Sequence, residues 1–506
     1  MLTALLNGTL ADGAGSELVR GDLLLRDGRI VECGSFTVPA DAEVIDCSGY
    51  VVAPGFIDAH SHSDLQVLGR NEEKLLQGVT AEVVGNCGFS PYPTGEHVVA
   101  LREFANGIFC GEGAWGWSSA DRYLHDAKQK APFASVYSLI GHGSLRIAVA
   151  GNRMDAMPDE MIARMESVLD EALAEGAVGF STGLMYAPGS SAGRDELERL
   201  CRVVAGRGKI YCTHMRDYGF RLLEAIDEQI ELAKATGCRL QISHLQAVGR
   251  ANRHLNQAAL EMIERAKDEG VDVAFDCYPY IAGSTVMTQL LPQWSLEGGA
   301  AALVQRLQDA QERSRIVAET RAAMVHEWSE LFVSAVGSEK NAVAVGKSLE
   351  EIAALRDCDA IDAMFDLLIE ENAQVNILEF NQSEENLRAN MTHPLALIIS
   401  DGFYVKGNPH PRLHGTFPEL LGTFCREKGW LDLPSAIHKV TGFPAERFRM
   451  KDVGLLRAGF AADIAVFDPK TIRSHATYTN PRQRPEGMMY VIRRGEVLFR
   501  SGDRSA

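Results

Sequence analysis

Two histidines one residue apart stand at the end of a short apolar run, in Asp58-Ala59-His60-Ser61-His62. In an extended backbone, side chains alternate between two faces, so His60 and His62 point in the same direction. Two imidazoles that face one point can bind one divalent metal ion. The spacing therefore predicts part of a metal site, although an isolated pair of this kind also arises by chance.

Further residues of metal-binding or proton-transfer types follow other β-branched runs: Cys87, His214, His244 and Asp401. The interval of 30 residues between His214 and His244 is about one strand–helix unit, which places them on adjacent strands. Each such residue alone is more often structural, as a buried cysteine usually is. Their recurrence after five of the eight strands predicted below indicates one shared site.

The middle of the chain alternates short β-branched runs with helical stretches, a pattern typical of parallel strand–helix units. The predicted strands cover residues 56–60, 80–84, 133–140, 178–181, 209–213, 239–243, 272–276 and 395–400. Two clear helices are predicted at 159–175 and 222–236, each followed by a glycine. Eight such units predict an α/β fold, a (β/α)8 TIM barrel, in which residues that follow the strands meet at one end.

Both ends of the chain have a different pattern. Alternating apolar positions surround turns at Asp27-Gly28 and Arg494-Gly495. We therefore expect a small β-sandwich domain formed by both termini, residues 1–54 with 415–506. The residues between them, 55–414, would form a metal-dependent barrel. A barrel of this type needs about 250 residues. The surplus, with one further strand-like run at 374–380, predicts an insertion at 284–378, before the last barrel strand.

Composition narrows the classes of partner. The 506 residues contain 50 Lys+Arg and 68 Asp+Glu, a net charge of −18, and this acidic balance opposes a nucleic-acid surface. No run approaches the roughly 20 apolar residues of a membrane span. The first residues lack the features of a signal peptide, and the ten cysteines include no CxxC pair. We expect a cytoplasmic protein that acts on a small molecule, with no nucleic-acid or membrane partner; the oligomeric state is not predicted.

In their order along the chain, these motifs resemble those of the amidohydrolase superfamily and, within it, the D-aminoacylase (N-acyl-D-amino-acid deacylase) family. The resemblance covers nearly the whole chain and is carried by Asp58-x-His60-x-His62, Gly85-Asn86-Cys87-Gly88-Phe89-Ser90, Phe180-Ser181-Thr182-Gly183-Leu184-x-Tyr186-x-Pro188-Gly189, Asp276-Cys277-Tyr278-Pro279-Tyr280, Ser400-Asp401-Gly402 and His410-Pro411-Arg412. It implies a zinc-dependent hydrolase that cleaves the amide bond of N-acyl-D-amino acids.

The resemblance also implies roles for the metal-binding residues. Hydantoinases and dihydroorotases carry a carboxylated lysine after the fourth barrel strand, whereas the fourth predicted strand here contains no lysine. Cys87 stands where D-aminoacylases have a metal-binding cysteine. Cys87, His214 and His244 would hold one tight Zn²⁺ and leave a position for water. His60 and His62 would complete a second, weaker site.

The remaining implied roles concern catalysis and substrate binding. Asp401 would accept a proton from the attacking water and deliver one to the departing amine. Arg412 would bind the free α-carboxylate of the substrate, with Tyr186 and Tyr278 beside it. One position departs from the family, because Gln246 stands where a lysine is common, and its neutral side chain weakens the carboxylate site.

Two other interpretations remain open. The first is a hydrolase of cyclic amides or imides on the same scaffold. Gln246 favours it, because the neutral side chain weakens the carboxylate site, whereas the absence of a lysine from the fourth predicted strand opposes it. The second is a non-catalytic scaffold, which would have lost some of the ligands. All of the predicted ligands and Asp401 are present, so catalysis is the expected function.

Overall fold

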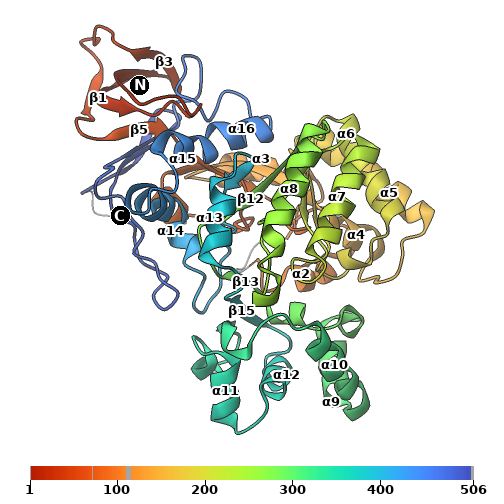
Figure 1. Ribbon diagram of the computed structural model, residues 1–506. Coiled ribbons are helices and arrows are strands. Elements are labelled where there is room, and N and C mark those ends of the chain that lie inside the picture. Colours follow the sequence, from red (N-terminus) through yellow and green to blue (C-terminus); the bar gives the residue numbers. More distant parts are fainter. Residues whose placement is uncertain (1, 71, 110–114, 503–506) are drawn as a thin grey trace.

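The barrel predicted from the sequence is present. The computed structural model describes residues 2–70, 72–109 and 115–502 (Figure 1). Parallel strands follow one another around one sheet in chain order: β6 (Phe56–Asp58), β7 (Val79–Val84), β8 (Ser135–Gly141), β9 (Gly179–Gly183), β10 (Ile210–His214), β11 (Arg239–Ile242), β12 (Val273–Cys277) and β16 (Ala396–Ile398). A parallel bridge between Ser61 and Gly402 joins the chain just beyond β6 and β16, so the barrel is nearly closed.

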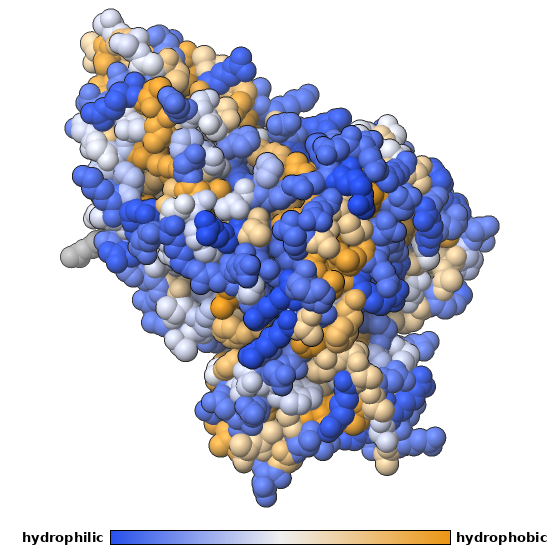
Figure 2. Space-filling model, in the orientation of Figure 1, coloured by the Kyte–Doolittle hydropathy of each residue, from blue (hydrophilic) through white to orange (hydrophobic). Residues whose placement is uncertain are grey.

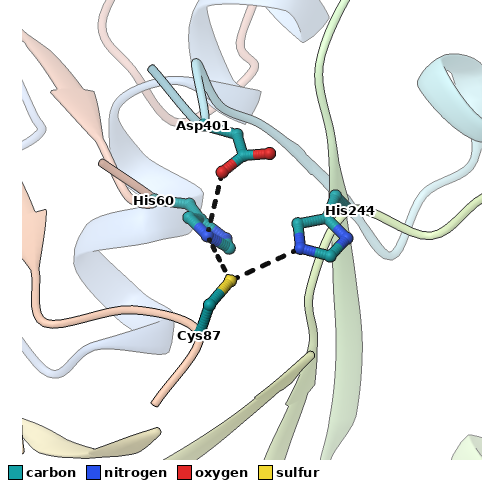
Figure 3. A group of neighbouring side chains, drawn as sticks. All are labelled: His60, Cys87, His244 and Asp401. Carbon is teal, nitrogen blue, oxygen red and sulfur yellow. Dashed lines mark hydrogen bonds and ion pairs between the residues drawn. The ribbon is translucent and has the colours of Figure 1, made fainter. Parts of the chain in front are cut away.

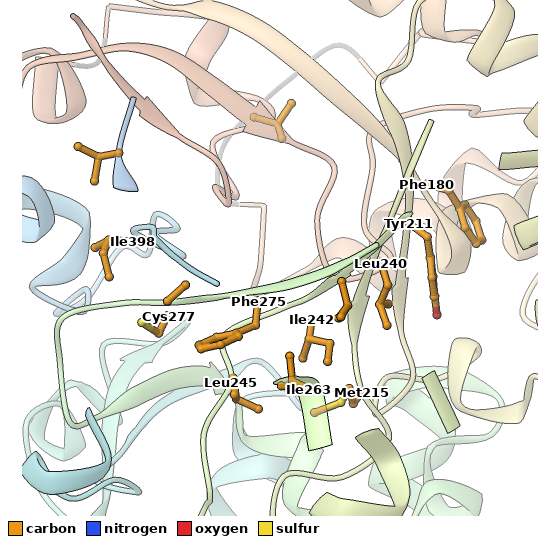
Figure 4. Close-up of a cluster of buried hydrophobic side chains, with 14 of the residues drawn as sticks. Phe180, Tyr211, Met215, Leu240, Ile242, Leu245, Ile263, Phe275, Cys277 and Ile398 are labelled. Atoms are coloured by element: carbon orange, nitrogen blue, oxygen red, sulfur yellow. The ribbon is translucent and has the colours of Figure 1, made fainter. Parts of the chain in front are cut away.

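Helices cover the outside of the barrel. They are α1 (Glu72–Leu75), α2 (Val98–Ala105), α3 (Ala120–Lys130), α4 (His142–Ala150), α5 (Asp159–Glu175), α6 (Arg194–Gly206), α7 (Leu222–Thr236), α8 (Leu255–Asp268), α13 (Glu384–Thr392), α14 (Arg412–Glu419), the π-helix η8 (Leu420–Glu427), α15 (Leu433–Lys439) and α16 (Gly442–Arg447). Apolar side chains of strands and helices share one large core, part of which Figure 4 shows.

The helices α5 and α7 have the bounds predicted for them. In α5 the buried residues Ile162, Met165 and Leu169 recur every three or four positions, so one face of the helix meets the barrel. Gly176 and Gly237 follow the two helices with positive φ, 121° and 70°. Glycine adopts this conformation without a steric penalty, which explains why each helix ends there.

Strands from the two ends of the chain form a second sheet. Its strands are β1 (Leu2–Leu10), β2 (Val19–Arg26), β3 (Arg29–Gly34), β4 (Glu43–Asp46), β5 (Val51–Pro54), β17 (Ile464–Phe467), β18 (Met488–Arg493) and β19 (Glu496–Arg500). β5 pairs with β17 and so joins the N-terminal strands to the C-terminal ones. Leu25 of β2 and Ile492 of β18 lie in one buried cluster, so the sheet curves around a common core as a sandwich does.

The start of the C-terminal strands differs from the prediction. Residues 415–463 were predicted to be β-rich, but they contain η8, α15 and α16, and the strands begin at Ile464. Ala436, Ile437 and Val440 are buried in the barrel core, and the backbone N–H of Ile57 donates to the carbonyl of Val440 at 2.8 Å. These residues cover a barrel strand with the apolar spacing of a helix, so the β pattern starts only where the chain returns to the terminal sheet.

A further group of elements lies between β12 and β16, where the surplus residues were predicted. β13 (Gly283–Val286), β14 (Leu331–Val336) and β15 (Val375–Glu379) form an antiparallel sheet with β15 at its centre. The helices beside it are α9 (Gly299–Gln308), α10 (Ala310–Ala323), α11 (Leu349–Arg356) and α12 (Ala360–Glu370). We call these elements, from β13 to β15, the insertion; they have a buried cluster of their own.

The insertion projects from one side of the barrel (Figure 1). Figure 2 shows this face of the molecule covered mainly by hydrophilic residues, with hydrophobic ones gathered near the junction of barrel and insertion. No helix in the described ranges is both long and apolar enough to cross a membrane.

Candidate active site

The barrel strands bring the predicted ligands and proton carrier to one end of the barrel. In strand order they are His60 and His62 after β6, Cys87 after β7, His214 at the end of β10, His244 after β11 and Asp401 after β16. All six are buried, and all except His60 line one cavity of about 480 Å³. The structure therefore places together residues that are far apart in the sequence.

Cys87 contacts two histidines of this group (Figure 3). Its Sγ is 3.3 Å from Nε2 of His60 and 3.5 Å from Nε2 of His244. The Nε2 atom of His60 is also 3.4 Å from Oδ1 of Asp401. One donor atom from each of these four residues lies within 4.8 Å of the others. Thiol, imidazole and carboxylate groups this close together form a candidate metal site.

His62 and His214 lie at opposite edges of the group. Nε2 of His62 is 3.2 Å from Oδ1 of Asp401, whereas Nδ1 of His214 is 3.1 Å from Nε2 of His244. His214 therefore extends the side of the group formed by Cys87 and His244. His62 extends the side formed by His60 and Asp401.

The donor set fits Zn²⁺. With Zn–S near 2.3 Å and Zn–N near 2.0–2.1 Å, neighbouring donors around a tetrahedral ion are roughly 3.3–3.6 Å apart. The three pairs Cys87–His60, Cys87–His244 and His214–His244 are 3.3, 3.5 and 3.1 Å apart. Burial lowers the pKa of His214 well below its usual range and that of His244 to about 4, so both imidazoles are in the neutral form that binds metals.

The cysteine requires a cation to become a ligand. Burial raises the pKa of the Cys87 thiol to about 11, so the neutral thiol is its form at neutral pH when no cation is near. A divalent ion reverses this preference, because a coordinating thiol loses its proton. The site therefore combines the neutral imidazoles of His214 and His244 with a thiol that binding of the ion would deprotonate.

The backbone is strained at several of these residues. Cys87, His244 and Asp401 have positive φ values of 52°, 35° and 49°, a region that residues other than glycine rarely adopt. The backbone N–H of Asp401 donates to the carbonyl of His60 at 2.8 Å, and that of His244 donates to Oδ1 of Asp276 at 2.6 Å. Such conformations persist where surrounding contacts hold them, and they are concentrated at functional sites.

Asp401 is held in its ionised form. Burial alone would raise its pKa, but Arg412, with Nη2 3.0 Å from Oδ2, and His60 outweigh burial and hold the pKa well below its usual range. Its other oxygen, Oδ1, faces His60 and His62. An ionised carboxylate beside the candidate metal site can accept a proton at neutral pH.

The four predicted substrate-binding residues line the same cavity. Arg412 is 1% exposed, and its guanidinium carbon lies 4.6 Å from the ring centre of Tyr278. The hydroxyl of Tyr278 donates to Oε1 of Gln246 at 3.1 Å, and that of Tyr186 is 3.2 Å from Oγ1 of Thr285. Within the described chain, Nε and Nη1 of Arg412 have no hydrogen bond. A buried guanidinium with uncommitted N–H groups can bind an anion.

Two residues beside the site were not among those predicted for it. Asp276, at β12, accepts the backbone N–H of His244 and lies 3.4 Å from Nδ1 of His60, so it orients both histidines. The hydroxyl of Tyr218 donates to the carbonyl of Ser243 at 3.0 Å, next to His244. Asp276 carried a signal, as an acid at the end of a predicted strand, whereas no spacing marks Tyr218.

A (β/α)8 barrel with histidines, a cysteine and an aspartate at the carboxyl ends of its strands is typical of metal-dependent hydrolases. The chain belongs to the amidohydrolase family, which its residues 43–499 match. The family membership expected from the motifs is thereby confirmed.

Within this family, the chain is similar to several deacylases of N-acyl-D-amino acids. The chain is 33% identical to D-aminoacylase from Alcaligenes xylosoxydans xylosoxydans over 98% of its own length and 94% of that protein's. It is 31% identical, with a TM-score of 0.84, to N-acyl-D-glutamate deacylase from Bordetella bronchiseptica, solved with zinc and a phosphonate inhibitor that mimics the tetrahedral intermediate; the match covers 98% and 96% of the two chains. A structure of D-aminoacylase with a binuclear metal centre, described as activated by one metal and attenuated by a second, is 29% identical with a TM-score of 0.85 over 100% and 98% of the chains.

Proposed function

We propose that this protein hydrolyses the amide bond of N-acyl-D-amino acids and releases a carboxylate and a free D-amino acid. One observation carries the proposal: a single cavity contains both the donor group around Cys87 and the buried Arg412 with two uncommitted N–H groups. The first can act on an amide carbonyl while the second holds the free carboxylate of the same substrate. The similarity to D-aminoacylase supports this substrate class.

In this proposal Cys87, His214 and His244 hold one tight Zn²⁺, and His60 and His62 contribute to a second, weaker site. The D-aminoacylase described as activated by one metal supports a single essential ion. When bound, the ion supplies Lewis-acid polarisation of the scissile carbonyl and lowers the pKa of the attacking water towards about 7.

The protein's own groups move the proton and hold the substrate. Asp401 accepts the proton of the attacking water through Oδ1 and delivers a proton to the amide nitrogen as the C–N bond breaks. Arg412 keeps Asp401 ionised through Nη2 and offers the free N–H groups of Nε and Nη1 to the α-carboxylate. Tyr278 packs against the guanidinium, and the amide of Gln246 offers neutral donors where the family commonly has a lysine.

A hydrolase of cyclic amides or imides receives less support. β9, the fourth strand of the barrel, has the sequence Gly-Phe-Ser-Thr-Gly and offers no lysine to carry a bridging carboxylate. No lysine is found among the described residues that line the cavity. A cyclic amide without a free carboxylate would also leave the buried N–H groups of Arg412 without a partner.

We also propose that the protein works in the cytoplasm. The nine cysteines in the described ranges are all free thiols. Free thiols are the normal state in a reducing compartment.

Metal analysis of a cysteine variant tests the site. Cys87→Ala removes the thiolate, so we expect the zinc content to fall from about one ion per chain towards none, together with turnover. Cys212→Ala is the matched control, because Cys212 is also a buried thiol of the barrel, on β10, the strand that ends at His214. This variant should keep both the zinc and the turnover. Undiminished zinc in Cys87→Ala would refute the assignment of this ligand.

A further inference from the structure

The insertion supplies one wall of the active-site cavity. β13 and β15 pair antiparallel, with Gly283 opposite Glu379. The carbonyl of Ser284, the next residue of β13, accepts a hydrogen bond from Nη2 of Arg412 at 3.4 Å. Glu379 itself lines the cavity. The insertion therefore brings a carboxylate to the neighbourhood of the guanidinium to which we assign the α-carboxylate of the substrate.

Glu379 has few partners for a carboxylate in this position. Its side chain is 12% exposed, and its only ion-pair contact among the described residues is with Nε2 of His326 at 3.8 Å. No side-chain hydrogen bond is found for it in that part of the chain. Burial raises its pKa, against smaller opposing effects of His326 and Arg412. A buried carboxylate without donors is costly unless a ligand supplies them.

Two other cavity-lining carboxylates differ in this respect. Oδ1 of Asp217 accepts the backbone N–H of Gly219 at 2.6 Å. Glu319 accepts hydrogen bonds from Nε1 of Trp294 at 2.6 Å and from Nε of Arg315 at 2.8 Å. Both are satisfied by the protein itself, so Glu379 is the one of these three carboxylates that is open to a ligand.

The described residues of the cavity offer no free cationic side chain to an acidic side chain of the substrate. Among the described residues that line it, the arginines are Arg221 and Arg412. The side chain of Arg221 is 72% exposed and pairs with Glu224 at 2.6 Å. Arg412 pairs with Asp401 and has its remaining N–H groups assigned to the α-carboxylate. A second carboxylate on the substrate would meet Glu379 without a free cation to offset the repulsion.

Apolar side chains lead towards the carboxylate. Val248, Met324 and Val325 line the cavity, and the last two directly precede His326, the neighbour of Glu379. Lysine and arginine side chains carry a charged tip on an apolar stem, and they commonly lay the stem along apolar surface. An apolar wall next to an unpaired carboxylate complements a side chain of this kind.

We propose that Glu379 is a specificity-determining residue that selects N-acyl-D-amino acids with a cationic side chain, of the D-lysine or D-arginine type, and disfavours those with an acidic one. The proposal rests on the function proposed above, because it takes the α-carboxylate to bind Arg412. The substrate then bridges two opposite charges, with its carboxylate on Arg412 and its ammonium or guanidinium group on Glu379. Such a preference is opposite in sign to the substrate named for the similar N-acyl-D-glutamate deacylase.

The test compares N-acetyl-D-lysine, N-acetyl-D-leucine and N-acetyl-D-glutamate on the zinc-loaded full-length protein. Turnover gives kcat/KM, and calorimetry of each compound at low temperature gives Kd. Glu379→Gln keeps the shape of the side chain and removes its charge. Glu319→Gln is the matched control, a cavity carboxylate already satisfied by Trp294 and Arg315. Thermal unfolding of both variants checks that they fold.

We expect the unaltered protein to prefer the lysine derivative over the glutamate derivative by about 100-fold or more, since a favourable charge contact at Glu379 replaces a repulsive one. Glu379→Gln should lower kcat/KM for the lysine derivative by about tenfold, through a higher KM and a higher Kd. It should change kcat/KM for the leucine derivative less than about twofold. Glu319→Gln should change neither.

Three results would contradict the proposal: a preference for the glutamate derivative, an equal loss for lysine and leucine derivatives in Glu379→Gln, or the same loss in Glu319→Gln. Failure of the proposed function is distinct from these. It would appear as no turnover of any of the three compounds, and the Kd values would still show whether Glu379 selects the charge of the side chain.

Discussion

Asp401 joins the two halves of the site, because one of its oxygens faces the histidines and the other pairs with Arg412. Asp401→Asn keeps the shape of the side chain but removes its capacity to accept a proton. We expect kcat to fall by about 10²–10⁴-fold, the usual contribution of a general acid–base group, while the tight zinc is retained. Asp217→Asn, at another aspartate of the cavity, should leave kcat nearly unchanged. Undiminished turnover in Asp401→Asn would mean that another group moves the proton.

The sequence indicated the residue types of the site better than their contacts. His60 and His62 could be predicted to face one way because an extended backbone alternates its side chains. The left-handed backbone at Cys87 and Asp401 could not be predicted, because tertiary contacts impose it against the local preference. The pairing of Arg412 with Asp401 was also not foreseen, since it depends on where α14 begins relative to β16.

The seam between β6 and β16 positions both sides of the site. Lys74 of α1 donates to Asp58 and to the hydroxyl of Ser400, and the backbone N–H of Ser400 donates to Oδ1 of Asp58 at 2.9 Å. All three residues are buried. Because Asp58 ends β6 shortly before His60 and Ser400 directly precedes Asp401, this network fixes the histidines relative to the carboxylate.

Removal of the lysine tests the importance of the seam. Lys74→Met leaves the buried carboxylate of Asp58 without its cation, so we expect a loss of about 3–5 kcal/mol in the free energy of unfolding, as for other broken buried pairs. Lys130→Met is the control, because Lys130 pairs with Asp126 on the surface with a side chain 57% exposed. Denaturant titration at pH 7 gives both values. Equal effects of the two substitutions would show that the ion pair does not hold the seam.

Local pattern predicted most barrel elements but not the long-range pairing of the insertion. The barrel strands and α5 and α7 carry their own signals, namely β-branched runs, helical periodicity and terminal glycines. Within the insertion, only the run that became β15 was recognisable. β13 and β14 are short and pair with it across many intervening residues, and such pairing depends on tertiary contacts that local propensity does not encode.

On the scale of the whole molecule, the net charge of −18 does not determine the local charge of the active-site cavity. The cavity contains the buried guanidinium of Arg412 beside the candidate metal site, and local charges of this kind outweigh the global field at short range. An acidic protein can therefore bind a carboxylate substrate.

The stability of the whole protein should depend on His414 in acid. Burial, with Arg482 and Lys74 nearby, lowers the pKa of His414 to about 4, compared with about 6.5 when the chain is unfolded. The unfolded chain therefore binds a proton between these two values that the folded protein does not. The contribution is complete above pH 6.5 and is lost as the pH falls through 4, with a total on the order of 3 kcal/mol.

Unfolding free energies at pH 7 and pH 4.5 test this dependence. His414→Gln should lose less stability between these pH values than the unaltered protein does, because the uncharged amide does not titrate. His125→Gln, at an exposed histidine, should behave like the unaltered protein. For each variant, the difference from the unaltered protein in this pH dependence gives the contribution of the substituted histidine alone. An unchanged pH dependence in His414→Gln would contradict the prediction.

The most direct test of the proposed function is the stereochemical preference of the zinc-loaded protein. kcat/KM is measured for the N-acetyl-D and N-acetyl-L forms of the same amino acids, beside a hydantoin and a small lactam. We predict that the D forms exceed the L forms by about 100-fold or more, because only one enantiomer can place its carboxylate on Arg412 and its amide beside Asp401 together. Equal rates for the two enantiomers, or faster turnover of the cyclic amides, would contradict the account.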